Sequence, residues 1–81
     1  MPEYFVQKFT IGNTKLTCYA KNNEHNHDKG NDFTKDVRAI LMAEYGVNSD
    51  AIELGPFMSK QPEPKNGGRE FKWNGENWVE K

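Results

Sequence analysis

The chain has 81 residues, of which 35% are hydrophobic, 28% charged and 12% aromatic, and its formal net charge is −1 at pH 7. This length predicts one globular domain spanning residues 1–81, and the large aromatic side chains exclude wholesale disorder. A nearly neutral chain has no overall field that would recruit nucleic acid or an anionic membrane surface.

The cellular compartment is predicted from three features of the sequence. Cys18 is the single cysteine, so an internal disulfide is excluded and a reducing compartment is favoured. Residues 1–3 lack the basic start of a signal peptide. The longest apolar run, at residues 39–43, is far shorter than a membrane span. We therefore expect a soluble, intracellular, cytoplasmic protein without membrane partners.

Residues 4–20 are predicted to form a β-hairpin around Gly12 and Asn13 as a two-residue turn. Directly paired residues share a face of the hairpin. The apolar residues then collect on one face: Phe5, Phe9, Ile11, Leu16, Cys18 and Ala20. A slip by one residue would mix the two faces, so the pattern itself selects this pairing. Cys18 is expected to fill the core, where its thiol is inaccessible as a nucleophile.

The polar run Lys21–Gly30 is predicted to be a mobile surface loop. It contains His25 and His27, whose spacing allows both imidazoles to reach one zinc or nickel ion. Stable sites take three or four well-held ligands, and this loop offers nothing rigid to hold them. We therefore expect no metal and no cofactor, with these two histidines as weak metal candidates.

A helix is predicted over Phe33–Tyr45, with Asn31 or Asp32 as its N-cap and Gly46 as its stop. Its apolar stripe recurs at three- and four-residue steps: Phe33, Val37, Ile40, Leu41 and Tyr45. Glu44 falls within this stripe, which places it where the last turn runs past the edge of a sheet.

The opposite, solvent-facing side of the predicted helix carries Lys35, Arg38, Ala39 and Met42. An apolar methionine among cationic side chains is a candidate contact for a protein partner.

The segment 51–57 is predicted to be a short strand that ends at Gly55 and Pro56, because Ile52 and Leu54 alternate with a polar residue. A short helix capped by Ser49 is the alternative. Residues 59–68 have no periodicity and are expected to form a mobile loop.

A second hairpin is predicted at the C-terminal end, where Asn74 and Gly75 separate aromatic segments. A two-residue turn pairs Phe71 with Trp78, and Phe71, Trp73 and Trp78 then share one face. A three-residue loop would instead turn Trp78 outward. Whether Trp78 belongs to the core stays open at this point.

These elements predict an α+β fold with the order ββα-β-ββ, in which one helix packs on a mostly antiparallel sheet of four or five strands. The same order of hairpin, helix and hairpin occurs in β-grasp domains, an analogy of arrangement without a shared motif. One core cluster is expected between helix and sheet: Phe9, Leu16, Val37, Ile40, Leu41 and Trp73.

A small non-enzymatic protein-binding module is the predicted function. The chain has no nucleophile elbow, P-loop, dinucleotide-binding glycine set or zinc-protease helix. Intracellular chains of this kind are often accessory or inhibitory proteins, including those of phages and mobile elements. The alternative is a nucleic-acid-binding protein that uses basic and aromatic residues near the C-terminus: Lys65, Arg69, Lys72 and Trp78.

Overall fold

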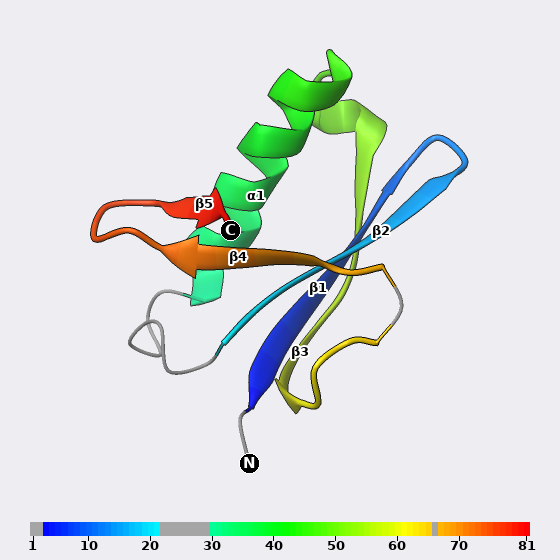
Figure 1. The fold of residues 1–81 in the computed structure, drawn as a ribbon. Helices are drawn as coiled ribbons and strands as arrows, with labels where there is room; N and C mark the ends of the chain where they lie inside the picture. The colour runs from blue at the N-terminus through cyan, green and yellow to red at the C-terminus, as the bar shows by residue number, and fades with distance from the viewer. Residues whose placement is uncertain (1–2, 22–29, 66) are drawn as a thin grey trace.

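The computed structural model describes residues 3–21, 30–65 and 67–81. Its elements, in chain order, are β1 (Tyr4–Ile11), β2 (Thr14–Lys21), α1 (Gly30–Tyr45), the 3₁₀ turn η3 (Ser49–Ala51), β3 (Ile52–Gln61), β4 (Arg69–Trp73) and β5 (Trp78–Glu80) (Figure 1). The strands form one sheet in the order β3-β1-β2-β4-β5, with α1 on one face. The predicted α+β class is confirmed.

The first hairpin has the predicted register. Phe9 lies opposite Leu16 and Phe5 opposite Ala20, across a turn in which Gly12 has a φ of 61°. This positive φ is a conformation that glycine adopts without a steric penalty. β1 and β2 form the centre of the molecule, since β3 pairs with β1 and β4 pairs with β2.

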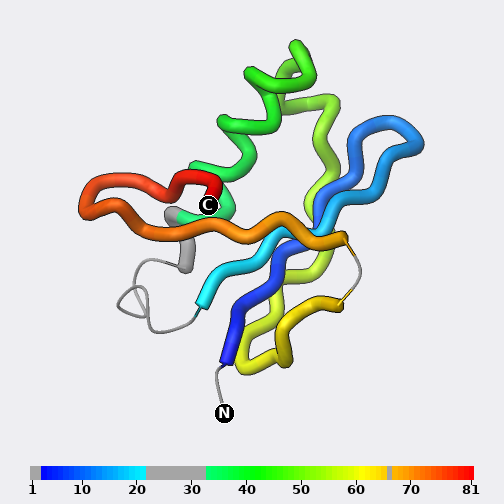
Figure 2. The backbone as a smooth tube through the Cα atoms, viewed as in Figure 1, coloured from blue at the N-terminus to red at the C-terminus, as the bar shows by residue number. Residues whose placement is uncertain are grey.

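Three of the four strand pairings are antiparallel, and the pairing of β2 with β4 is parallel. After β3 ends, the chain turns back before it enters β4, and this return brings β4 in parallel to β2 (Figure 2). A parallel pair needs such a crossover connection, whereas neighbouring antiparallel strands need only a turn.

Helix α1 begins at Gly30, so Asn31 and Asp32 lie inside its first turn and are not the N-cap that the sequence predicted. The helix ends as predicted: Gly46 has a φ of 65°, and the Val47 N–H donates to the carbonyl oxygen of Met42 at 3.2 Å. This is the Schellman arrangement of a helix C-terminus. Over the described ranges, no helix is both long enough and apolar enough to cross a membrane.

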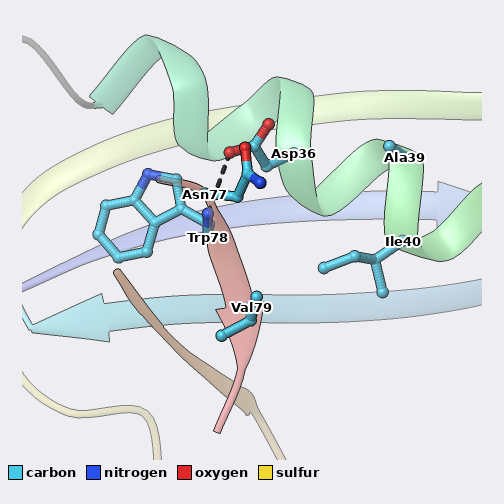
Figure 3. A pocket seen from close by; sticks show the side chains of 6 residues that line it. All are labelled: Asp36, Ala39, Ile40, Asn77, Trp78 and Val79. Atoms are coloured by element: carbon cyan, nitrogen blue, oxygen red, sulfur yellow. Dashed lines mark hydrogen bonds between the residues drawn. The ribbon is translucent and has the colours of Figure 1, made fainter. Parts of the chain in front are cut away.

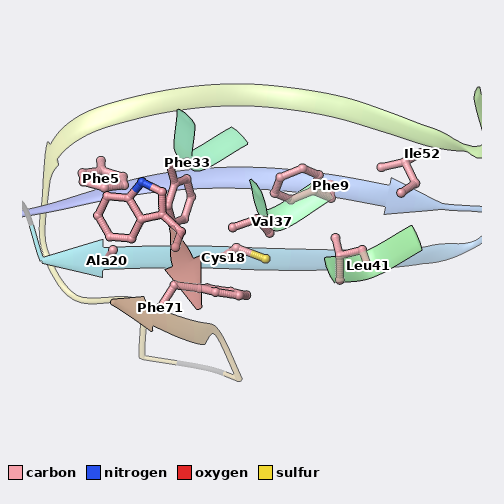
Figure 4. Close-up of a cluster of buried hydrophobic side chains, with 10 residues drawn as sticks. Phe5, Phe9, Cys18, Ala20, Phe33, Val37, Leu41, Ile52 and Phe71 are labelled. Carbon is pink, nitrogen blue, oxygen red and sulfur yellow. The ribbon is translucent and has the colours of Figure 1, made fainter. Parts of the chain in front are cut away.

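The core lies between α1 and the two central strands. Phe33, Val37 and Leu41 project from the helix over β1 and β2 and are fully buried (Figure 4). The buried cluster consists of Phe5, Phe9, Cys18, Ala20, Phe33, Val37, Leu41, Ile52, Phe71 and Trp78. Three residues predicted for the core, Leu16, Ile40 and Trp73, are only partly buried and pack against this cluster.

Strand β3 continues through Gly55 and Pro56 to Gln61, so the predicted strand end at these two residues is wrong. An edge strand tolerates proline because one side of its backbone has no neighbour, and a register shift falls between Gln7 and Phe9 on β1, opposite this point. The alternative prediction, a short helix capped by Ser49, is met only by the three residues of the 3₁₀ turn η3, which precedes the strand.

The second hairpin differs from both predicted registers. Trp73 pairs with Trp78, which leaves a four-residue loop instead of a two- or three-residue one. The Asn74 side-chain oxygen accepts from the backbone N–H groups of Glu76 and Asn77, each at 2.8 Å. This asparagine turn stabilises the longer loop. The predicted shared face of Phe71, Trp73 and Trp78 survives, because all three contact the helix-side cluster.

The face of the sheet away from α1, here called the outer face, has a smaller cluster of Tyr4, Val6 and Tyr19. The segment between β3 and β4 lies against it: the Tyr4 hydroxyl is 3.4 Å from Glu63, and an added Cβ on Gly68 would lie 2.6 Å from the Tyr19 ring. Part of the segment predicted to be a mobile loop is therefore packed over the outer face.

Candidate functional site

Hydrogen bonds fix the rotation of α1 on the sheet. On one flank, the Thr34 hydroxyl donates to the side-chain oxygen of Gln7 on β1 at 2.9 Å. On the other flank, the Asp36 carboxylate accepts from the backbone N–H of Trp78 at 3.0 Å. Because the strand order runs from β3 to β5, the Thr34 flank faces β3 and the Asp36 flank faces β5.

Gln7 connects three elements and was missed by sequence reasoning. Its side chain is 2% exposed, donates to the carbonyl oxygen of Gly55 at 2.7 Å and accepts from Thr34 of α1. The sequence did contain a signal for this role, because Gln7 is a polar residue between Phe5 and Phe9 on the apolar face of the hairpin. A buried amide side chain there needs hydrogen-bond partners on neighbouring elements. Gln7 thus holds the bulged part of β3 and the helix to the central strand.

Large apolar side chains are left uncovered on the Thr34 side of the helix. Within the described residues, the exposed large hydrophobic side chains are Tyr45, Leu54 and Phe57, at 39%, 46% and 42% exposure. Leu54 lies opposite Phe9, and Phe57 stacks on Phe5 with ring centroids 5.6 Å apart. Both therefore project from the helix-side face of β3, beyond the reach of the helix.

A helical residue advances about 100°, which places Arg38 and Tyr45 within about 40° of Thr34 around α1. These two residues therefore lie on the same flank as β3. We call Arg38, Tyr45, Leu54 and Phe57 the α1–β3 surface. It combines three exposed large apolar side chains with a half-buried arginine.

Of the predicted contact residues on α1, Lys35 and Ala39 are exposed and Arg38 is half-buried. Met42 does not point freely into solvent as predicted: it is half-buried and packs against the core cluster. A methionine side chain is long and flexible enough to fold back over the edge of a core.

A shallow hollow of about 330 Å³ lies on the opposite flank, between α1 and β5 (Figure 3). Its lining residues are Asp36, Ala39, Ile40, Asn77, Trp78 and Val79. The Asp36 carboxylate, its one ionisable lining group, already accepts the Trp78 N–H. One oxygen of the only ionisable group in this hollow is therefore occupied by a backbone N–H.

The predicted nucleic-acid residues are not brought together. Arg69 donates to Glu80 through Nε at 2.8 Å and through Nη2 at 2.6 Å, and its Nη1 and Nη2 reach Glu44 at 3.2 and 2.7 Å. Its guanidinium is thus held between β5 and the end of α1. Glu44 is exposed and pairs with Arg69 of β4. Trp78 is 1% exposed, so its ring cannot stack on a base.

The Arg69 cluster makes stability depend on pH. Hydrogen bonds from Arg69 lower the pKa of Glu80. A lowered folded-state pKa contributes stability above the unfolded value of about 4.3, and this contribution is lost as the pH falls through the folded-state pKa. We expect the wild-type melting temperature to fall more than that of Glu80→Gln between about pH 5 and pH 3. Equal acid sensitivity of both proteins would contradict this role for Glu80.

Cys18 is fully buried, and its burial raises the pKa of the thiol to about 12. Since the thiolate is the reactive form, we expect the folded protein to resist iodoacetamide at about pH 8 and to be alkylated at once in denaturant. Mass spectrometry of the two samples checks this. Rapid alkylation of the folded protein would contradict the placement of Cys18 in the core.

A second hollow, of about 290 Å³, lies on the outer face. Lys8, Lys15 and two threonines line it, together with Gly55 and Pro56 of β3. Neither lysine has an ion pair with a described residue. Phe9 and Leu16 complete its lining, and it lies on the other side of the sheet from the α1–β3 surface.

The two candidate metal ligands, His25 and His27, lie outside the described residues. In the part of the chain that the structure describes, no three His, Cys, Asp or Glu side chains gather in a way that would hold a metal ion. Lys65 and Lys72 are exposed. Lys72 alternates with Phe71 along β4 and therefore faces away from buried Trp78.

Comparisons of the chain with protein-family models, with curated proteins and with solved structures find no match. The function must therefore be inferred from the geometry described above.

Proposed function

We propose that this protein is a small non-enzymatic protein-binding module that contacts its partner through the α1–β3 surface. One observation carries the proposal: by helical phase and strand register, the exposed large hydrophobic side chains of the described residues share one flank of the molecule with Arg38. Contiguous apolar side chains next to a polar rim are typical of protein-interaction sites.

The side chains of this surface are suited to serve as anchors. Fully burying a leucine or phenylalanine side chain contributes about 1.5–3 kcal/mol, so covering the exposed parts of Leu54 and Phe57 contributes roughly 1 kcal/mol each. Arginine and aromatic residues are also enriched among the residues that dominate binding energies. Leu54 and Phe57 are held by a strand whose position Gln7 fixes, which reduces the entropy cost of ordering them.

The nucleic-acid alternative has less support. Arg69 is occupied by two carboxylates, and Trp78 is in the core. A chain with a net charge of −1 also gains little from counterion release. We also propose that the protein acts in the cytoplasm as an accessory or inhibitory protein, of the type found in phages and mobile elements.

Capture experiments test the proposal. Immobilised wild-type protein and a Leu54→Ser variant are incubated with lysate of the source organism, and retained proteins are identified by mass spectrometry. We expect a protein that the wild type retains and that Leu54→Ser retains at least tenfold more weakly, which corresponds to a loss of about 1.4 kcal/mol. Leu54 is 46% exposed, so the substitution should leave the fold intact.

Thr17→Ser provides a matched control on the outer face, where a partner of the α1–β3 surface makes no contact. It should retain the same protein as the wild type. Arg38→Glu should weaken retention. Arg38 is a better test of the helix than Met42, because Met42 packs against the core. Equal retention by wild type, Leu54→Ser and Arg38→Glu would refute the proposed surface. Salt-sensitive retention of an oligonucleotide instead of a protein would favour the alternative function.

A further inference from the structure

We propose that the α1–β3 surface receives an acidic amphipathic helix of the partner protein. This inference rests on the proposed function and goes further, because it commits to the chemistry and the conformation of the bound element. Three observations carry it: the obstructed edge of β3, two cations of α1 that form no ion pair with a described residue, and the arrangement of the exposed apolar side chains.

The middle of β3 is a poor template for an added strand. Pro56 has no N–H to donate, and the carbonyl oxygen of Gly55 already accepts from Gln7 at 2.7 Å. Register shifts interrupt the pairing with β1 at two places, and Lys60 has a φ of 58°. Proline, bulges and twisted backbone are devices that block edge-to-edge pairing. A partner therefore contacts β3 through side chains, which favours a helix over a strand.

Arg38 of the α1–β3 surface has a second cation beside it, Lys35, on the outward side of α1. Lys35 and Arg38 lie one turn apart on α1, and neither has an ion pair with any described residue. Two acids of the same helix are engaged elsewhere: Asp36 accepts a hydrogen bond from Trp78 on the β5 flank, and Glu44 accepts from Arg69. Charge complementarity therefore calls for carboxylates on the partner.

A second copy of this chain is a poor occupant. Two copies related by a two-fold axis would present the same patch to each other, so the interface would contain Lys35 and Arg38 of both copies. Like charges gathered in one interface are unfavourable. A heterologous acidic partner fits the surface better.

The spacing of the apolar side chains suits a helix. Leu54 and Phe57 are three residues apart, a distance of about 10 Å along a strand that the bulge shortens. Apolar residues at i and i+7 of an α-helix are separated by about 10.5 Å. A helix lying between α1 and β3 would thus place its apolar stripe on Leu54 and Phe57 and its acidic residues toward Lys35 and Arg38.

Three synthetic helical peptides test the inference. They share one apolar stripe at i, i+4 and i+7 and differ only in the flanking residues, which are glutamate, glutamine or lysine. Binding is measured by fluorescence anisotropy at low and at physiological salt. We expect the glutamate peptide to bind at least tenfold more tightly than the glutamine peptide at low salt, with a smaller advantage at physiological salt because exposed charges are screened.

Two double variants with the same change in net charge locate the effect. Lys35→Glu/Arg38→Glu should reverse the preference, so that the lysine peptide binds most tightly. Lys8→Glu/Lys15→Glu, on the outer face, should keep the preference for the glutamate peptide. Leu54→Ser should weaken binding of all three peptides. Circular dichroism verifies that each variant is folded.

Several results would overturn the inference. Equal binding of the glutamate and glutamine peptides would show that the surface does not select acidic residues. An equal effect of the two charge-reversal variants would show that the preference depends on the net charge of the protein and not on Lys35 and Arg38. Failure of all three peptides to bind would also refute it, while the capture experiment decides the proposed function separately. A wild-type dimer in sedimentation analysis that Leu54→Ser dissociates would show that the occupant is a second copy.

Discussion

Replacing Trp78 by alanine should destabilise the domain by about 3–5 kcal/mol. Its ring is 1% exposed and lies among three others, with centroids 5.4 Å from Phe5, 5.2 Å from Phe33 and 5.6 Å from Trp73. An 81-residue domain has a total free energy of unfolding of about 4–12 kcal/mol. If this domain lies at the low end of that range, the substitution removes nearly all of its stability. Chemical denaturation followed by circular dichroism measures it.

Trp73→Ala is the matched control for this substitution. Trp73 is partly buried at the margin of the cluster, so its truncation should cost clearly less than that of Trp78. A larger loss for Trp73 than for Trp78 would mean that the C-terminal hairpin packs in the outward-facing register that a three-residue loop would produce.

Leu41→Ala should lower the free energy of unfolding by about 2–5 kcal/mol, or the melting temperature by at least about 8 °C. The side chain is fully buried at the C-terminal end of the helix stripe and belongs to the core cluster. A cavity there cannot be filled by water, because its neighbours are apolar.

Lys35→Ala, on the exposed side of the same helix, is the corresponding control. It should change stability by less than about 0.5 kcal/mol, because an exposed side chain without an ion pair contributes little. If Leu41→Ala melted within a degree or two of the wild type, the helix would bury a different face from the one described here.

Periodicity predicted much of the fold because it reports on a local property. The pairing of Phe9 with Leu16 follows from the two-residue turn and the alternation of apolar residues, and the stop at Gly46 follows from its tolerance of positive φ. Both depend on residues close together in sequence. The register of the second hairpin was wrong because the Asn74 side chain stabilises a longer loop that backbone preferences alone do not favour.

The candidate site was harder to predict because it depends on the strand order. A five-stranded sheet is roughly 19–20 Å wide, whereas a helix with its side chains covers about 10–12 Å. One helix therefore leaves part of an apolar face uncovered, but the sequence does not say which edge strand is left out. Leu54 is predicted to share the core face with Ile52, because the two residues flank Glu53 in the strand. In the structure Ile52 is buried, whereas Leu54 is 46% exposed.

Residues far apart in sequence account for the remaining differences. Arg69 was grouped with basic neighbours, but the structure places it between Glu44 of α1 and Glu80 of β5. Arg38 was predicted to face solvent and is half-buried. Its place on the flank of Leu54 and Phe57 follows from the rotation of α1, which the Thr34 contact with Gln7 fixes and which no local pattern indicates.

Site-specific photo-crosslinking tests the central claim most directly. A photoreactive amino acid is placed at Leu54, on the α1–β3 surface, or at Thr17, on the outer face, and each protein is irradiated in source lysate. We predict one crosslinked protein product of defined mass from position 54 and none from position 17. Crosslinking of a protein from position 17 but not from position 54 would contradict the account.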